Sequence, residues 1–504
     1  MSVTPTYPVA HPTWYDTIRL MFTQTDIAHM RSQELDLTSY EQVQAASGNI
    51  YGQVAAHNMP PDNPWTPDMV QTFLNWLTDG CPKGTPTADQ VYATRAAVQT
   101  AAARIRKDIN SLSAAELATL KTAFEGILAK DPSDPNSYFA QAGIHWLPER
   151  FCQHHVPAYN PWHRAYLMGF ENALRSVPGC GNVTLPYWDI TTPFPDLLKS
   201  APYDSYTLPQ DVGGGFNKGY VTQRFSYSVI AANLLQYDVT GCVNRALSKT
   251  DWEDFHGYWS GAPYDTIIAG HDGGHGSIGP TMGNQAVASF DPVFWFFHSN
   301  WDRLWGEWQK KVQATDLNGL LSTINKTTDL LSYQIFTLPP LEALTPFTAG
   351  PLGLNTLKTI DSVNSLGVDY APPAAAPKAL AFALKTSRAV ALGRQISVNP
   401  QNATVSVTGI NRTKIPGSFA VHLMKDGKRI ASRFMFQPDD VDKCETCVKN
   451  AMAHFDFGLP LAEVTGGKLS VQVEPVNKSI VGARFPARLM GNPMIDVHIP
   501  LQTD

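Results

Sequence analysis

Six histidines in two separated runs constrain this chain of 504 residues more than any other feature of its sequence. The first run holds His145, His154 and His163, and the second holds His271, His275 and His298. Three neutral imidazoles per ion, with few carboxylates or thiolates among them, suit a borderline transition metal that keeps a position open for a ligand. Two such sets in one chain predict a pair of copper ions.

The second run has helical spacing. His271 and His275 are four residues apart, so on a helix both rings project from one face and can close on one ion. His298 lies about two turns into an aromatic helix that is predicted to begin at Asp291-Pro292. A pair at this spacing also occurs on surface helices, and a lone histidine among aromatic residues is ordinarily a core residue. The metal interpretation therefore depends on the whole set.

The first run repeats this logic. A helix is predicted from Trp162 to about Arg175, with His163 in its first turn. His154 and His155 are adjacent, so at most one of them is expected to face the same metal. We choose His154, because it lies nine residues before His163 and follows Cys152 by two residues.

Four motifs carry a family resemblance: IHWLP at His145, CQHHVPAYNPWHRAYL at His154 and His163, HDGGH at His271, and SFDPVFWFFHSNWDRLW at His298. Together they resemble the tyrosinases, type 3 dicopper proteins of the polyphenol oxidase family. The resemblance implies a mainly α fold whose four-helix-bundle core binds one copper through the first three histidines and another through the second three. Family members bind dioxygen between the coppers, then hydroxylate monophenols, oxidise o-diphenols to o-quinones, or do both.

The same resemblance draws attention to neighbours of the ligands. Where relatives have Cys-x-His at this place, a thioether joins the cysteine to the histidine ring, so Cys152 is expected to be bonded to His154. Three positions depart from the common pattern: Phe297 replaces a histidine, Ile268 replaces a glutamate that helps to hold a water, and Asp272 replaces an asparagine.

Asp272 has two interpretations. An ionised carboxylate beside a metal ligand can accept a phenolic proton, directly or through water. Alternatively, it only orients a neighbouring ligand as a hydrogen-bond acceptor.

The chain is expected to form more than one domain. Its length and its 43% hydrophobic content allow a large core. We predict a helical dicopper oxidase domain over residues 1–370, with residues 88–130 as two alanine-rich helices, and a Pro/Ala-rich connector over 371–378. Residues 379–504 alternate apolar and polar residues around turns such as Asp426-Gly427, which predicts an antiparallel β domain.

Many tyrosinase-like chains carry a C-terminal β domain that covers the copper entrance and keeps the enzyme latent, often by inserting an aromatic side chain. Residues 379–504 resemble such a lid in position and class, and the alternative is an independent partner-binding module. The aromatic residues considered for insertion are Phe434, Phe436, Phe455 and Phe457.

Cys444 and Cys447 form a CxxC pair in the same segment. Because thiolates favour Cu(I), a transient copper site that helps to load the coppers is one interpretation. A disulfide, or two ordinary thiols in a turn, is the other.

Net charge and the N-terminal sequence limit the partners and the cellular location that we expect for this chain. A net charge of −6 and the lack of a Lys/Arg block argue against nucleic acid. The N-terminus lacks a basic start and an apolar stretch, and no segment has the length and apolarity of a membrane span, so we expect a cytoplasmic or otherwise intracellular chain without membrane attachment. Homo-oligomer formation stays open.

The function predicted from these observations is a copper-dependent tyrosinase acting on phenolic small molecules and dioxygen. Two alternatives share the copper pair: a catechol oxidase limited to diphenols, and a hemocyanin-like oxygen-binding protein. The missing signal peptide and the single copper pair favour an enzyme over a hemocyanin. A dizinc hydrolase is disfavoured, because such sites usually contain bridging carboxylates.

Overall fold

A computed structural model describes residues 7–33, 35–56, 59–60, 64–84, 104–147, 150–257, 266–337, 344–347, 354, 356–374, 402–476 and 489–499. The chain divides into two compact units, residues 1–102 and 103–504. The predicted boundaries at 370 and 379 fall inside the second unit and stay a prediction, since residues 375–401 are not among those described.

The first unit is helical. Its elements are η1 (Ile18–Leu20), α1 (Gln24–Ser32), α2 (Tyr40–Ala45), α3 (Ser47–Ala55) and α4 (Pro67–Thr78). The hydroxyl of Thr66 caps α4 by accepting a hydrogen bond from the backbone N–H of Met69, and Pro67 occupies the first helical turn, where its missing N–H costs nothing. Aromatic residues, among them Trp14, Phe73 and Trp76, fill the core of this unit.

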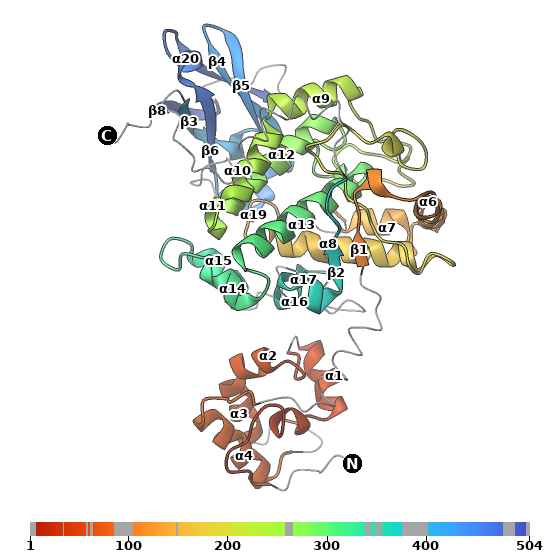
Figure 1. The fold of residues 1–504 in the computed structure, drawn as a ribbon, viewed down its shortest axis with the longest axis vertical. Coiled ribbons are helices and arrows are strands. Elements are labelled where there is room, and N and C mark those ends of the chain that lie inside the picture. Colours follow the sequence, from red (N-terminus) through yellow and green to blue (C-terminus); the bar gives the residue numbers. More distant parts are fainter. Residues whose placement is uncertain are drawn as a thin grey trace. The chain divides into compact units, whose positions relative to one another are not determined.

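The second unit is built around three helices that carry four of the six candidate metal ligands (Figure 1). These are α8 (Tyr159–Arg175), α12 (Ile267–Ile278) and α13 (Val293–Val312), and α8 packs against α13. The helices around them are α6 (Ala114–Leu128), α7 (Tyr138–Gly143), η2 (Ile109–Ser111), η3 (Asp196–Lys199), α9 (Tyr227–Gln236), α10 (Val239–Ser248), α11 (Trp252–His256), η4 (Ala288–Phe290), α14 (Leu317–Ser322), α15 (Leu330–Thr337), α16 (Thr356–Ile360) and α17 (Ser362–Leu366). The predicted helical core is confirmed.

Helix α13 starts next to a buried ion pair. The carboxylate of Asp291 accepts a hydrogen bond from the N–H of Val293 and pairs with Arg224. The helix therefore begins one residue after the predicted start at Pro292 and ends at Val312, as expected. Helix α8 begins at Tyr159, three residues earlier than predicted, because element boundaries are the part of a structure that sequence patterns define least well.

One predicted helix is wrong in part. Strand β1 (Arg104–Arg106) lies inside the segment 88–130 and pairs in parallel with β2 (Val368–Tyr370). The fully buried guanidinium of Arg106 contacts the carboxylates of Glu171 and Asp302 at 2.7 and 3.3 Å. Pairing with a distant strand and burial of this ion cluster outweigh the helical preference of the alanine-rich sequence. Helix α6 confirms the second alanine-rich helix, and most of the first lies outside the described residues.

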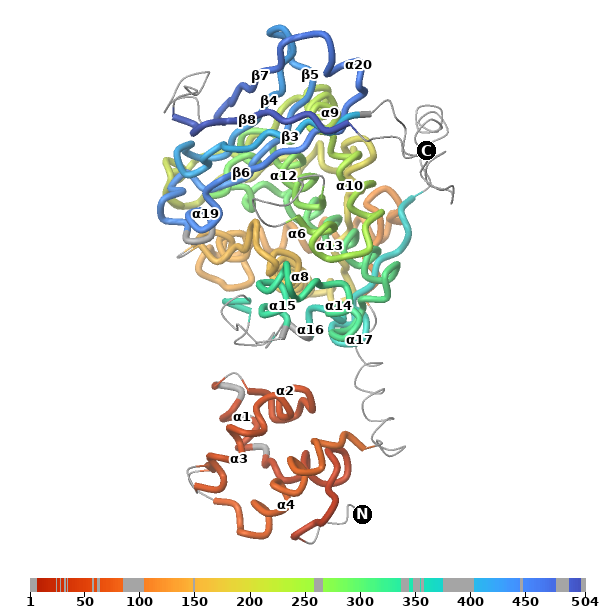
Figure 2. Tube along the Cα trace, turned by 90° about the vertical axis from the view of Figure 1, so that its left-hand side faces the viewer, coloured from red at the N-terminus to blue at the C-terminus, as the bar shows by residue number. Residues whose placement is uncertain are grey.

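The C-terminal strands form two antiparallel sheets of three strands each (Figure 2). One has the order β6 (Met452–Pro460), β3 (Asn402–Asn411), β8 (Gly491–His498), and the other β5 (Lys428–Met435), β4 (Phe419–Lys425), β7 (Leu469–Pro475). Asp426 and Gly427 both have positive φ, 50° and 79°, as a tight turn between β4 and β5 requires. The predicted antiparallel β segment is confirmed. Short helices η6 (Arg412–Lys414), η7 (Val441–Lys443), α19 (Glu445–Lys449) and α20 (Leu461–Val464) connect the strands.

These strands pack on the helices of the same unit, mainly through β5 and α12. Phe434, near the end of β5, and Phe436, directly after the strand, belong to the same apolar core as the histidine-bearing helices. Gly276 permits this close packing, because a Cβ atom there would lie 2.4 Å from the ring of Phe434. Among the described residues, no helix has the length and apolarity needed to cross a membrane.

Candidate metal centre

The six histidines meet as two buried triads. One consists of His145, His154 and His163, the other of His271, His275 and His298, and the ligand atoms within each triad lie within 4.8 Å of one another. Helix α12 carries His271 and His275, α13 carries His298, and α8 carries His163. His145 lies just after α7, and His154 lies just before α8. Both predicted triads are therefore present as spatial clusters.

Hydrogen bonds orient the rings. Nδ1–H donates to a carbonyl or carboxylate oxygen in four of them: His145 to Gln285 O (3.2 Å), His163 to Tyr159 O (2.8 Å), His271 to Asp272 Oδ1 (2.9 Å) and His275 to Met282 O (2.7 Å). A proton on Nδ1 leaves the lone pair of Nε2 free. This is the arrangement usual for histidines that bind metal through Nε2.

The Nε2 atoms fit a metal. In the described part of the chain, those of His145, His154, His163 and His271 are buried and have no hydrogen-bond partner. The other two, of His275 and His298, lie 3.3 Å apart. Buried polar atoms are normally paired, so this concentration of unpaired nitrogens requires a ligand. Since each triad consists of imidazoles alone, the donor set fits copper.

Burial keeps these rings neutral. It lowers the pKa of His145 from 6.5 to about 3, and it lowers the pKa values of the other five below their usual range. A neutral imidazole is the form that binds metal. The protein therefore presents the rings in the binding form at ordinary pH.

Gln285 contacts two ligands of the first triad and was not predicted. Its backbone carbonyl accepts from His145, and its side-chain amide lies 2.7 Å from Nδ1 of His154. Turning the amide end for end places Oε1, which otherwise lacks a partner among the described residues, against Nδ1–H of His154. No motif in the sequence marks this residue.

Asp272 is enclosed by hydrogen-bond donors. Oδ1 accepts from Nδ1–H of His271, and Oδ2 accepts from Nε2 of His155 at 2.8 Å and from the N–H of Phe436 at 3.0 Å. Burial opposes ionisation, but His155 and His271 outweigh it and hold the pKa of this carboxyl well below its usual range. Asp272 thus contacts the ring of His271 directly, and its role stays a prediction. His155, which we set aside as a ligand, is its partner.

Phe436 covers the second triad. Its ring stacks on His275 with centroids 3.9 Å apart and lies edge-to-face with His154 at 5.2 Å and with His271 at 6.0 Å. The other three aromatic residues considered for insertion lie elsewhere. Phe434 packs on Tyr237, and Phe455 and Phe457 belong to the core between the sheets.

Phe297 and Ile268, two of the three residues that depart from the family pattern, are buried apolar side chains. The ring of Phe297 lies 4.7 Å from that of His275, in an edge-to-face arrangement. Ile268 is buried in the helical core. Neither side chain can hold a water or bind a metal.

The cysteines take two forms. Cys152 is a buried free thiol, and burial raises its pKa to about 12. Cys444 and Cys447 are joined by a disulfide, with Cα atoms 5.1 Å apart. This is one of the alternatives that the sequence left open, and a copper clip requires the pair to be reduced.

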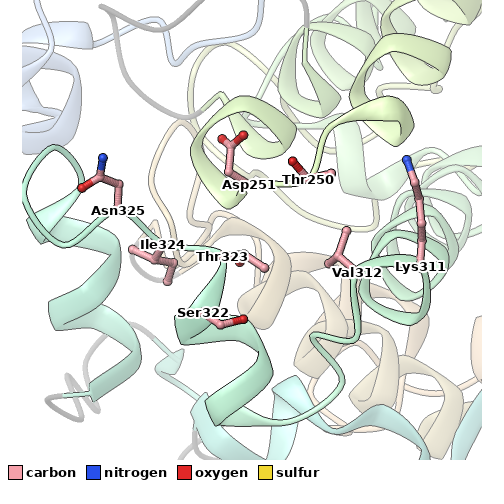
Figure 3. Close-up of a pocket in the computed structure, with 8 residues that line it drawn as sticks. All are labelled: Thr250, Asp251, Lys311, Val312, Ser322, Thr323, Ile324 and Asn325. Atoms are coloured by element: carbon pink, nitrogen blue, oxygen red, sulfur yellow. The ribbon is translucent and has the colours of Figure 1, made fainter. Parts of the chain in front are cut away.

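A surface pocket of about 590 Å³ lies apart from this chemistry (Figure 3). Its lining consists of Thr250, Asp251, Lys311, Val312, Ser322, Thr323, Ile324 and Asn325. None of these residues belongs to either triad. We therefore assign it no part in the metal centre.

Comparison with known proteins agrees with the geometry. Residues 135–240 and 216–311 match the family described as the common central domain of tyrosinase. The chain is 28% identical over 285 residues to hemocyanin A-type, units Ode to Odg, of Enteroctopus dofleini, a match that covers 51% of this chain and 21% of that protein. It is 24% identical over 331 residues to tyrosinase HcTyr1 of a Hahella species, covering 53% of this chain and 71% of the relative.

The fold is also found in solved structures. The tyrosinase of Burkholderia thailandensis aligns over 79% of this chain and 100% of its own, with a TM-score of 0.58 at 22% identity. A recombinant mushroom tyrosinase aligns over 79% of this chain and 92% of its own, with a TM-score of 0.56 at 17% identity. At these identities, the likeness establishes a common fold.

Proposed function

The chain is a tyrosinase-like protein of the type 3 dicopper class, and we propose that it is a phenol oxidase that uses dioxygen to hydroxylate monophenols and to oxidise o-diphenols to o-quinones. Its relatives bind two copper ions through two histidine triads, and this chain holds two such triads. When bound, the coppers supply dioxygen binding and electron transfer.

The observation that carries this proposal is the position of the Phe436 ring. It lies flat against the ligand His275 and edge-on to two further ligands. A phenol that is oxidised at the metals needs a flat apolar place beside the same rings. The phenylalanine side chain, which is a phenol without its hydroxyl, occupies such a place and supports an aromatic substrate.

The same contact supports latency. Phe436 is fully buried, so a substrate can reach this position only after the ring has moved. We propose that the C-terminal strands act as the predicted lid and that Phe436 is the inserted residue. The proposal predicts a low basal turnover that rises when the ring is removed.

Asp272 is proposed to orient His271 and not to accept a proton from substrate. Its three donors come from the protein, and its carboxylate is fully buried. The proton acceptor for a monophenol is then a group outside this carboxylate. The thioether between Cys152 and His154 stays a proposal, testable by the loss of two hydrogens from the mass of the joined peptides.

The test is an oxygen-consumption assay of copper-loaded full-length protein on a monophenol and its matching diphenol, with and without Phe436→Ala. We expect quinone formation with both substrates, at a higher rate in the variant. If a fully copper-loaded variant oxidises neither substrate, the phenol oxidase proposal fails.

Reversible oxygen binding is the second candidate. It is favoured by the 28% identity to an octopus hemocyanin. The two functions separate in one experiment: an oxygen carrier binds and releases dioxygen without net consumption when catechol is present, whereas an oxidase consumes it. Activity limited to diphenols would instead identify a catechol oxidase.

A further inference from the structure

Four groups connect the C-terminal strands to the second metal site. They are the guanidinium of Arg412, the ring of His155, the carboxylate of Asp272 and the ligand His271, and every one is buried. The successive distances are 3.3 Å from Arg412 Nη2 to His155 Nδ1, 2.8 Å from His155 Nε2 to Asp272 Oδ2, and 2.9 Å from Asp272 Oδ1 to His271 Nδ1.

The C-terminal segment holds Arg412 in place. The residue begins the short helix η6, directly after β3, and its Nε donates to Oε1 of Gln437 at 2.9 Å. The amide nitrogen of Gln437 donates in turn to the backbone carbonyls of Arg412, Ile415 and Gly417. Arg412 Nη2 also lies 3.5 Å from Cys447 Sγ, in the disulfide. The guanidinium is thus fixed by several contacts within its own segment.

The direction of each hydrogen bond follows from the first. A guanidinium can only donate, so His155 Nδ1 must accept. The proton of the neutral ring then sits on Nε2 and is donated to Asp272. The carboxylate can accept this bond with Oδ2 and the bond from His271 with Oδ1. His271 therefore keeps its proton on Nδ1, and the lone pair of Nε2 faces its triad.

The backbone of His155 is consistent with a specific role. Its φ of 53° is a left-handed conformation that non-glycine residues adopt rarely. This conformation turns His155 toward Asp272 and Arg412, while the adjacent His154 faces the first triad. Two neighbouring histidines consequently serve different partners.

We infer that Arg412 and His155 are positioning residues for the second metal site, which act through Asp272 on the orientation of His271. The C-terminal segment thus contributes to metal binding as well as covering the site. This inference rests on metal binding by the second triad and is independent of the substrate that the protein oxidises.

The test measures copper retention in full-length protein. Wild type, Arg412→Met, His155→Leu and His155→Gln are loaded with copper and titrated with a chromogenic copper(I) chelator. We expect Arg412→Met and His155→Leu to release one of the two coppers 10- to 100-fold more readily, because partners that orient a ligand typically contribute this much to metal affinity. His155→Gln retains an N–H donor for Asp272 and should remain within a few-fold of wild type.

Two controls make the result specific. Arg429→Met removes an arginine of β5 whose ion pair with Glu474 is long, 3.7 Å, and should leave both coppers unchanged. Urea unfolding of each metal-free variant checks folding, and if Arg412→Met does not fold, the two His155 variants decide. Equal weakening of both coppers, wild-type retention in folded His155→Leu, or no difference between His155→Leu and His155→Gln would overturn the inference.

Discussion

The ring of Phe436 stacks on the ring of His275, with centroids 3.9 Å apart and planes inclined by 11°. Phe436 directly follows strand β5, and His275 is a histidine of the second triad on α12. The contact joins the C-terminal sheet directly to the metal centre. Substrate access and the position of this sheet are therefore expected to depend on each other.

Replacing Phe436 with alanine should raise diphenol turnover about tenfold or more. A stacked aromatic pair contributes about 0.5–1.5 kcal/mol beyond its buried area, and tenfold corresponds to about 1.4 kcal/mol. Initial rates of quinone formation at equal copper content measure the effect. Phe455→Leu, a change in the core between the sheets, is the matched control and should leave the rate near that of wild type. Equal rates for Phe436→Ala and wild type would argue against the lid.

A methyl group at Gly276 should disturb the same interface from the side of the helix. The added Cβ would lie 2.4 Å from the ring of Phe434, so this buried ring must shift. Overpacking of this kind costs about 1–3 kcal/mol, more than the roughly 1 kcal/mol that alanine gains over glycine in a helix. We expect Gly276→Ala to lower the melting temperature and raise diphenol turnover. Gly458→Ala in β6 has open space around it and should do neither. A more stable Gly276→Ala variant would contradict the packing.

Replacing Asp272 with asparagine should reduce monophenol and diphenol turnover by the same factor. The carboxylate of Asp272 accepts hydrogen bonds from three donors, and the asparagine amide N–H cannot accept any of them. The ring of His271 is then held less firmly, which lowers the turnover of both substrates. We expect a 10- to 100-fold loss of copper affinity at one site. Asp456→Asn, which alters a carboxylate bonded to His454 in the sheet, is the control. A selective loss of monophenol turnover would instead identify Asp272 as the proton acceptor.

The metal-free protein should lose stability as the pH falls from about 7.5 to 5.5. The triad histidines have pKa values depressed by burial, so the unfolded chain, in which the ordinary value is 6.5, takes up protons first. Each such group contributes at most about 1.4 kcal/mol per pH unit below 6.5. The pKa of Asp272 is lowered in the folded protein from its ordinary value of 3.8. This carboxyl therefore adds to the loss of stability only at pH values below this range. Urea unfolding midpoints across the range measure the slope, and a flat profile would contradict it.

The CxxC pair should affect copper loading only when it is reduced. Thiolates bind Cu(I), whereas the disulfide between Cys444 and Cys447 leaves no thiolate to do so. We expect protein pretreated with dithiothreitol to load Cu(I) faster than the Cys444→Ala, Cys447→Ala double variant. The uptake rate is measured with a chromogenic chelator as donor. Equal rates would exclude the copper clip and leave the disulfide as a structural link.

The two metal triads could be predicted from the sequence because each carries local signals. The spacing of His271 and His275 places them on one helical face, and the residues around His298 have the pattern of a buried helix. The turn at Asp426-Gly427 likewise marks a hairpin through residues that tolerate positive φ. In these places, neighbours in sequence determine the structure.

The remaining features depend on distant contacts. Strand β1 pairs with β2, whose residues lie more than 260 positions later, so its alanine-rich surroundings were misleading. The packing of the sheet on the helices determines which of the four phenylalanines reaches the metal centre, and this is Phe436. The bond between His155 and Asp272 likewise joins residues that are distant in the sequence. Gln285 contacts its histidines through a backbone carbonyl as well as its amide, and any residue supplies the former.

The carboxylate of Asp272 receives the backbone N–H of Phe436 on one oxygen and orients His271 with the other. If the sheet in its closed position strengthens binding of the second copper, then binding of that copper must stabilise the closed position by the same free energy, because linkage between two equilibria is reciprocal. Movement of Phe436 that admits a phenol should therefore also speed the loss of copper. Catalytic rate and working lifetime would then oppose each other in this protein, and a variant selected for one should be poorer in the other.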